Sequence, residues 1–213
     1  MIDTVFFEFP SGEVVNSADY GLILKSFDAP EPKVRTYRVQ VDGADGELDM
    51  TEWAGVVRFE NRTVTIAFRD MQSEGYKQLV NHVLGRNCKI FLSSDPAWYF
   101  YGRCDGAGSS TRKRVTDTPL VFTCQPYKLR KYPTIIRSSV TSSGTSILVR
   151  TLRRSAIPKI KLTAACTIEY NGATYSFAAG THTVAGIVIT DTPKIMVVKG
   201  SGNVTITFDE GVI

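Results

Sequence analysis

Few residues in the 213-residue chain have the types and spacing that covalent chemistry needs. Either of the two histidines, His82 and His182, could act as a general base, but neither accompanies a Gly-x-Ser-x-Gly elbow that would present a serine nucleophile. His82 also falls in a segment with helical spacing, where a plain surface or half-buried histidine is the expected role. The sequence therefore predicts no catalytic triad, and we expect a protein that is not an enzyme.

Metal and disulfide chemistry find equally little support. Four cysteines are scattered along the chain: Cys88, Cys104, Cys124 and Cys166. None forms a Cys-x-x-Cys pair, and His82, six residues before Cys88, would need further ligands from elsewhere to hold zinc. A chain of this length also needs no covalent staples. We expect reduced thiols on strands, no metal and no cofactor.

A glycine-rich stretch, residues 102–109, has the composition of a phosphate-binding loop. However, no Gly-Lys-Ser/Thr follows it, and the next residues have strand character, not helical character. The sequence therefore predicts a flexible connection between strands, without a phosphate site.

Charged residues are sorted into separate segments. Residues 42–52 contain five acids and no base, with glycines that give loop character, and the spacing does not match an EF-hand calcium loop. These acids are Asp42, Asp45, Glu47, Asp49 and Glu52. The basic clusters are Arg112-Lys113-Arg114, residues 128–131, and Arg150 with Arg153-Arg154. The acidic segment alone predicts a solvated hairpin tip.

The charge balance divides the chain near Pro133. Residues 1–133 carry 17 bases and 17 acids, whereas residues 134–213 carry 8 bases and 4 acids, so the net charge of +4 belongs to the second part. That surplus is too small for a dedicated nucleic-acid-binding protein. Opposite charges in separate loops suit a protein whose copies meet through unlike faces, although solvated loops would give the same pattern.

Targeting and membrane signals are not expected. The N-terminal residues have no basic region, and Asp3 and Glu8 flank their apolar residues, so we expect no secretory signal and synthesis in a cytoplasm. The longest uncharged stretch, residues 170–190, contains several glycines and an asparagine and is unlike a bilayer span.

Hydrophobic periodicity predicts an α+β first part. Residues 37–41 and 63–68 alternate as strands, and Glu60-Asn61 makes residues 56–68 a candidate hairpin or bent strand. Helical spacing joins Tyr76, Leu79, Val80, Val83 and Leu84, with Ser73 as a candidate N-cap and Gly85 after the C-terminus. Further strands are predicted at residues 87–93, 97–103 and 120–125, which gives an antiparallel sheet or split barrel with one helix.

The second part predicts a β-sandwich. After a serine-rich stretch, seven short apolar runs follow within about 70 residues, a density typical of two packed sheets. They are residues 147–149, 157–162, 166–170, 173–177, 186–189, 195–198 and 204–208. Asn171-Gly172 is a type I′ hairpin signal. The predicted organisation is a first domain over residues 1–133, a linker over 134–145 and a sandwich over 146–213.

Taken in order, several segments resemble one known family. In the first part they are D-G-A-D-G-E-L-D-M-T, E-G-Y-K-Q-L-V-N-H-V-L-G, S-D-P-A-W-Y-F-Y-G-R and L-V-F-T-C-Q-P-Y-K; in the second, I-P-K-I-K-L, T-I-E-Y-N-G-A-T-Y-S-F, A-A-G-T-H-T-V and V-T-I-T-F-D-E-G. Their order and spacing resemble the distal tail protein family of long-tailed, non-contractile (siphovirus-type) bacteriophages. The chain departs from that pattern at Thr192-Pro193-Lys194 and in its final residues from Glu210.

The resemblance implies a hexameric ring at the distal end of the phage tail in the virion. The first domain would form a belt around a central channel, and the second would be a galectin-like sandwich outside it. Expected partners are further copies of the chain, the tail tube protein, the tape-measure protein and tail-tip or baseplate proteins of the tail-associated lysin type. DNA would only pass through the channel, and no membrane is involved.

The resemblance turns the charged loops into candidate contacts. We expect the acidic segment, Asp42 to Glu52, to contact a neighbouring subunit or the tube, with Arg112, Lys113 and Arg114 as its counterpart. The rival hypothesis is a carbohydrate-binding module that recognises host cell-wall glycan through the sandwich or through the aromatic strand, Trp98 to Tyr101, although we expect those aromatics to be core. A tail-tip hydrolase is a third, less supported hypothesis.

Overall fold

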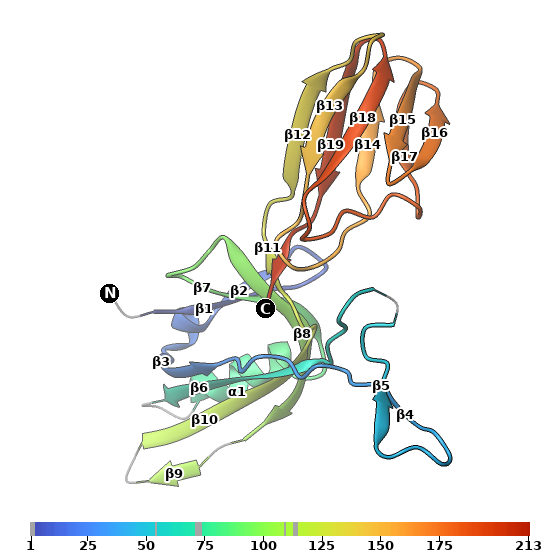
Figure 1. Cartoon of the computed structure of the whole chain (residues 1–213). Coiled ribbons are helices and arrows are strands. Elements are labelled where there is room, and N and C mark those ends of the chain that lie inside the picture. The colour runs from blue at the N-terminus through green and yellow to red at the C-terminus, as the bar shows by residue number, and fades with distance from the viewer. Residues whose placement is uncertain (1–2, 54, 71–73, 109, 113–114) are drawn as a thin grey trace. The chain divides into compact units, whose positions relative to one another are not determined.

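The structure is a computed structural model that describes residues 3–53, 55–70, 74–108, 110–112 and 115–213. The chain divides into two compact units, residues 1–128 together with Ile213, and residues 129–212 (Figure 1). Each unit has its own buried hydrophobic cluster. The protein is mostly β, with several antiparallel sheets and one α-helix, and no helix among the described residues is long and apolar enough to cross a membrane.

The first unit is built on an antiparallel sheet whose main path consists of seven strands, each hydrogen-bonded to the next. Their order is β2-β1-β7-β8-β10-β6-β3. The strands are β1 (Val5–Glu8), β2 (Val14–Asn16), β3 (Ile23–Asp28), β6 (Arg62–Asp70), β7 (Asn87–Leu92), β8 (Trp98–Ala107) and β10 (Val115–Cys124). A short strand β9 (Ser110–Arg112) pairs with β10, and a 3-10 helix η1 (Ser17–Tyr20) follows β2.

The predicted helix is confirmed as α1 (Glu74–Val83). Its buried face consists of Tyr76, Leu79 and Val83, as the helical spacing requires. The Tyr76 hydroxyl donates a hydrogen bond to the Pro119 carbonyl at 2.9 Å and accepts one from the Gly108 N–H at 3.1 Å. These two bonds tie the helix to the sheet. Ser73, the predicted N-cap, lies outside the described residues.

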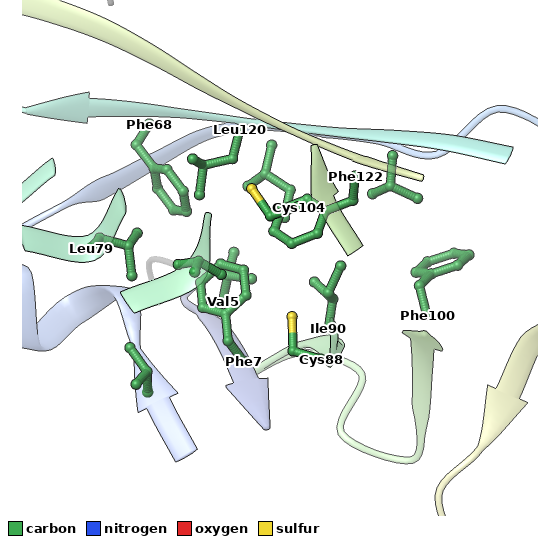
Figure 2. Packing of buried hydrophobic residues seen from close by; sticks show 14 of the residues in the cluster. Val5, Phe7, Phe68, Leu79, Cys88, Ile90, Phe100, Cys104, Leu120 and Phe122 are labelled. Atoms are coloured by element: carbon green, nitrogen blue, oxygen red, sulfur yellow. The ribbon is translucent and has the colours of Figure 1, made fainter. Parts of the chain in front are cut away.

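The core of the first unit lies where the helix and the inner strands meet (Figure 2). The Phe7 and Phe122 rings stack at 5.8 Å between centroids, and Phe68 and Leu120 are fully buried beside them. Three cysteines, on β7, β8 and β10, are buried and free, and the fourth is buried and free on β15 of the second unit. The prediction of reduced, strand-borne thiols is therefore confirmed.

The predicted hairpin over residues 56–68 is wrong. Only its second half forms a strand, β6, and Phe59 bridges to Val34 instead. Strand β6 has β10 along one edge and β3 along the other, so both edges are filled by partners distant in sequence. The alternation of apolar and polar residues within one segment does not show which distant strands pair with it.

The expectation of a flexible connection at residues 102–109 is also wrong for most of its length, because β8 continues through Ala107. Gly102 allows close packing of two backbones: a Cβ atom there would lie 2.4 Å from the Thr123 carbonyl oxygen and 2.6 Å from Cys124 Cα. The glycine therefore serves sheet packing and not phosphate binding.

The second unit consists of two four-stranded antiparallel sheets around one core. One sheet has the order β12 (Thr134–Ser139), β19 (Asn203–Phe208), β14 (Lys159–Leu162) and β17 (Gly180–Thr183). The other has the order β13 (Thr145–Val149), β18 (Lys194–Gly200), β15 (Cys166–Tyr170) and β16 (Ala173–Phe177). Strands β11 (Lys128–Arg130) and β20 (Gly211–Val212) pair with each other.

Most of the predicted apolar runs of the second part are strands. Asn171 and Gly172, with φ of 55° and 79°, form the predicted turn between β15 and β16. Residues 186–189 are not a strand, although Ile187 and Ile189 are buried. Residues 134–139 of the expected linker are strand β12, which pairs with β19. Its alternate residues face solvent. Two of them, Arg137 and Ser139, are polar and give the segment its linker-like composition.

We predict that Gly102→Ala destabilises the first unit by about 1–3 kcal/mol, because the added methyl group must displace the backbone of β10. The matched control is Gly106→Ala on the same strand, where the new Cβ would lie 3.5 Å from Val121 Cβ, an ordinary contact. Chemical denaturation of both variants measures the difference. Equal stability of the two would contradict the close approach of β8 and β10.

Candidate subunit-contact surfaces

A long excursion, hereafter the arm (residues 29–61), leaves the sheet after β3 and returns at β6. At its base the Arg35 N–H donates to the Arg58 carbonyl and the Glu60 N–H donates to the Lys33 carbonyl, both at 2.8 Å. Farther out, β4 (Arg38–Gln40) and β5 (Glu47–Asp49) form a two-stranded hairpin. Figure 1 shows this hairpin lying away from the seven-stranded sheet.

The arm carries large apolar side chains that the described residues leave exposed. Trp53 is 74% exposed and Tyr37 is 56% exposed. Other large exposed apolar residues of the arm are Val34, Val41, Leu48 and Val56. The two aromatics line a groove of about 250 Å³ together with Arg35, Thr51, Val56 and Arg58. Tryptophan, tyrosine and arginine are the residues that most often dominate protein–protein binding energies.

The acids predicted as contacts lie on this arm and are exposed. Asp42 and Asp45 are in the turn between β4 and β5, Glu47 and Asp49 are on β5, and Glu52 follows the hairpin. Arg38 partly balances them, with its guanidinium 3.8 Å from the Glu47 carboxylate. The hydroxyl and N–H of Thr51 bond the Asp49 carboxylate and hold its pKa below the usual value. The prediction of a solvated hairpin tip is confirmed.

The predicted basic counterpart is only partly described. Arg112 is the last residue of β9, and Lys113 and Arg114 lie outside the described residues. Strand β9, which ends at Arg112, pairs with β10. The contact of the three basic residues with the acidic hairpin of another copy stays a prediction.

A buried arginine lies where the arm rejoins the sheet. Arg62, the first residue of β6, is 5% exposed, and its guanidinium carbon is 5.3 Å from the centre of the Phe100 ring. Its Nε and Nη2 atoms have no hydrogen-bond partner among the described residues. Burial lowers the pKa of the guanidinium, and the charges of Cys124 and Glu31 oppose that shift. The base of the arm therefore contains an incompletely satisfied cation.

Sequence patterns did not reveal the groove on the arm. The alternation of apolar and polar residues predicted a half-buried strand over residues 37–41. However, Tyr37 and Val41 are exposed, because none of the described residues forms a layer over the hairpin. Trp53 belongs to no periodic apolar pattern, because it stands alone in a polar segment. The available signal was an aromatic residue flanked by glycine and acids, at a place where no amphipathic pattern would bury it.

The aromatic strand named for the rival hypothesis is β8. Phe100 is buried, as expected of core, whereas Trp98, Tyr99 and Tyr101 are half-buried. Trp98 and Phe100 line a pocket of about 250 Å³ with apolar residues of β3 and β7, and the Lys128 ammonium lies 2.5 Å from the Asp95 carboxylate at its edge.

Four larger aromatics of the sandwich are buried or half-buried, whereas Tyr132, before β12, is 71% exposed. Tyr170 and Phe208 are buried in its core. Tyr175 and Phe177 are half-buried and stack on each other at 6.3 Å, and the Phe177 ring lies 4.7 Å from the His182 ring. Both Tyr175 and Phe177 also pack against the core of the second unit.

The cysteine thiols are buried, and both histidines make contacts with neighbouring polar groups. Burial raises the pKa of the Cys88 and Cys124 thiols to about 12 and that of Cys104 to about 11, so these thiols stay protonated near neutral pH. His82 Nδ1 lies 3.6 Å from a Glu13 carboxylate oxygen, and His182 Nε2 is 2.9 Å from the Ala178 carbonyl oxygen.

The search of family models and the search of curated proteins found no match. A search of solved structures found the Dit protein of phage SPP1, with a TM-score of 0.72 and 16% identity over 100% of both chains. This chain has the Dit fold. A chain of the phage P2 baseplate in its Ca-bound, activated conformation is also similar, with a TM-score of 0.51 and 7% identity over 100% of this chain and 99% of that one.

The full-length match to Dit confirms the resemblance found in the sequence at the level of fold. The SPP1 protein is described as a paradigm of the hub adsorption apparatus of phages that infect Gram-positive bacteria. Both units of the chain are included in the match, so the Dit fold accounts for the α+β unit and the sandwich together.

We predict that Arg62→Met leaves the free energy of unfolding unchanged or raises it by about 1 kcal/mol, because it keeps the packing volume and removes a buried, unsatisfied charge. Arg62→Ala, the control, also removes the packing on Phe100 and should lower it by about 1–3 kcal/mol. Urea denaturation measures both. A loss of more than about 2 kcal/mol in Arg62→Met would reveal a partner for the guanidinium.

Proposed function

We propose that this protein is a non-enzymatic hub of the phage tail tip, which forms a hexameric ring and joins the tail tube to the tip or baseplate proteins that attach the virion to its host. The observation that carries the proposal is the Dit fold over the full length of the chain. The proposed location is the distal end of the tail in the virion.

The ring would close through unlike surfaces. A cyclic assembly with more than two subunits needs a heterologous interface, in which one patch of each copy meets a different patch of the next. The arm supplies one such patch, because it presents Tyr37, Trp53 and five acids without a covering layer. The neighbouring first unit would supply the other, with the Arg112 to Arg114 connection as the basic part of it.

The charge balance suits a channel that lets DNA pass. Residues 1–133 carry 17 acids and 17 bases, and residues 1–128, which belong to the first unit, carry 17 acids and 15 bases, so the first unit has no basic excess. A strongly basic lining would retain duplex DNA through the release of its counterions, whereas a neutral lining would not. The first unit would therefore form the belt around the channel, and the second, proposed to be galectin-like, would lie outside it.

The partners follow from the position of such a ring. On one rim it would bind the tail tube protein, and the tape-measure protein would lie in the channel. On the other rim it would bind tail-tip proteins of the tail-associated lysin type. Rigid rim surfaces would fix these components by geometry, without a reaction.

The direct test is imaging of the purified protein by negative-stain electron microscopy with light scattering. We expect an annulus whose class averages have six-fold symmetry and a mass of six chains. A protein that stays monomeric at high concentration, and also after addition of the neighbouring tail components, would contradict the hub.

Trp53→Ala should weaken ring assembly by about 2 kcal/mol or more per interface, because it removes the most exposed aromatic side chain of the arm. Leu148→Ala is the matched control, since Leu148 is 63% exposed but lies on β13 of the second unit. Sedimentation velocity over a concentration series compares the two. An equal effect of both variants would exclude the groove as the contact.

Reversal of three acids on the hairpin, Asp45→Lys, Glu47→Lys and Asp49→Lys, should also weaken ring formation. The effect should be greatest at low salt, where charges are least screened, and should shrink as the ionic strength approaches about 1 M. Analytical gel filtration at several salt concentrations measures it. Unchanged assembly at low salt would remove the hairpin acids from the interface.

A further inference from the structure

The outer face of one sandwich sheet is basic and rich in hydroxyl groups. This sheet, with the order β12-β19-β14-β17, buries Ile160, Leu162, Val204 and Ile206 against the core. Because side chains alternate along a strand, the residues between them face solvent. They are Ile135, Arg137 and Ser139 on β12, Asn203, Thr205 and Thr207 on β19, Lys159 and Lys161 on β14, and Thr181 and Thr183 on β17.

Strand register gathers the cations. In one row across the sheet Arg137 is opposite Thr205, which is opposite Lys161, so the two cations are two strand spacings, roughly 10 Å, apart at the backbone. Lys159 is two residues from Lys161 on the same strand, roughly 7 Å away. Three positive charges thus flank a strip of threonine hydroxyls.

No carboxylate balances these charges within the sheet. The solvent-facing positions of its four strands, all of them described, include no acid. Three of the four acids of the second unit have other partners: Glu169 is 2.5 Å from the Lys199 ammonium, Asp191 is 3.0 Å from the Arg153 guanidinium, and Glu210 is 2.8 Å from that of Arg130. The fourth, Asp209, lies just beyond the end of β19. The outward positions of the four strands therefore carry three cations and no acid.

The chemistry of the face favours oxyanions over a protein or a nucleobase. A hollow of about 460 Å³ on it is lined by Arg137, Lys161, Thr205, Asn203, Ser139 and Thr163, among others. Arginine, lysine and hydroxyl side chains are the usual ligands of phosphate groups. The centres of protein interfaces are instead poor in lysine and rich in aromatics, and bases of single strands need aromatic side chains for stacking. The outward positions of these described strands include no aromatic residue.

We propose that this face binds a base-free phosphodiester polymer, a linear chain of polyol phosphate units. The three cations take successive phosphate groups, and the threonine, serine and asparagine side chains between them bond the hydroxyls of the polyol. The inference concerns the second unit alone and does not depend on ring formation.

The test measures binding of purified poly(glycerol phosphate) to the full-length chain by isothermal titration calorimetry at several salt concentrations. The test variant is Arg137→Gln with Lys159→Gln and Lys161→Gln. The matched control is Arg150→Gln with Arg154→Gln and Lys194→Gln, which removes the same charge from positions outside this sheet. Single-stranded DNA of equal charge and dextran serve as comparison ligands.

We expect the test variant to bind the polymer roughly tenfold or more weakly, with a salt slope smaller by about two, while the control variant changes little. We also expect weaker binding of DNA and none of dextran. Lys161→Gln alone, in the middle of the face, should cost roughly threefold and provides a milder variant if the triple unfolds. The proposal is overturned if the wild-type protein does not bind the polymer, if both triples lose affinity equally, or if DNA binds as tightly. Loss of ring assembly in the test variant alone would make the face a subunit contact, which also overturns it.

Discussion

The central constraint of this structure is that 33 residues connect two adjacent strands without forming a hydrophobic core of their own. Strands β3 and β6 are hydrogen-bonded neighbours, and the whole arm, residues 29–61, is the connection between them. Six of its large apolar side chains, among them Tyr37 and Trp53, stay exposed to water, although each would gain about 1.5–3 kcal/mol on full burial. A segment of this kind is stable on its own only through its hairpin and its base, so its exposed surface favours association.

The two units are chemically different in ways that fit separate roles. The first has 15 bases and 17 acids in residues 1–128, contains the seven-strand path of the large sheet with a helix, and carries the arm. The second has its own core and an excess of basic residues, of which three lie on one open sheet. Our two proposals, self-assembly and recognition of an external polymer, therefore concern different surfaces of one chain.

Local patterns in the sequence predicted the features that depend on neighbouring residues. The helix follows from the spacing of Tyr76, Leu79 and Val83, and the turn at Asn171-Gly172 follows from the need for positive φ. The features that failed depend on distant partners. Strand β6 does not fold back on residues 56–59, because β10 and β3 occupy its edges.

The same distinction applies to the candidate site. The acids of the hairpin could be found from sequence because they form a run without a base, whereas the groove of Tyr37 and Trp53 could not, since exposure is set by the absence of a covering layer. Strand β12 could not be found from sequence because two of its three outward residues, Arg137 and Ser139, are polar, and its pairing with β19 makes it a strand.

The most direct test of this account is the accessibility of Trp53 before and after assembly. The chain has two tryptophans, so Trp98→Phe leaves Trp53 as the only strong fluorophore. Acrylamide quenching should be strong in dilute, dissociated protein and should fall several-fold in the assembled ring, with a blue shift of the emission as the indole leaves water. An assembled ring in which Trp53 is quenched as readily as in the dissociated protein would show that the arm is not the surface that holds the subunits together.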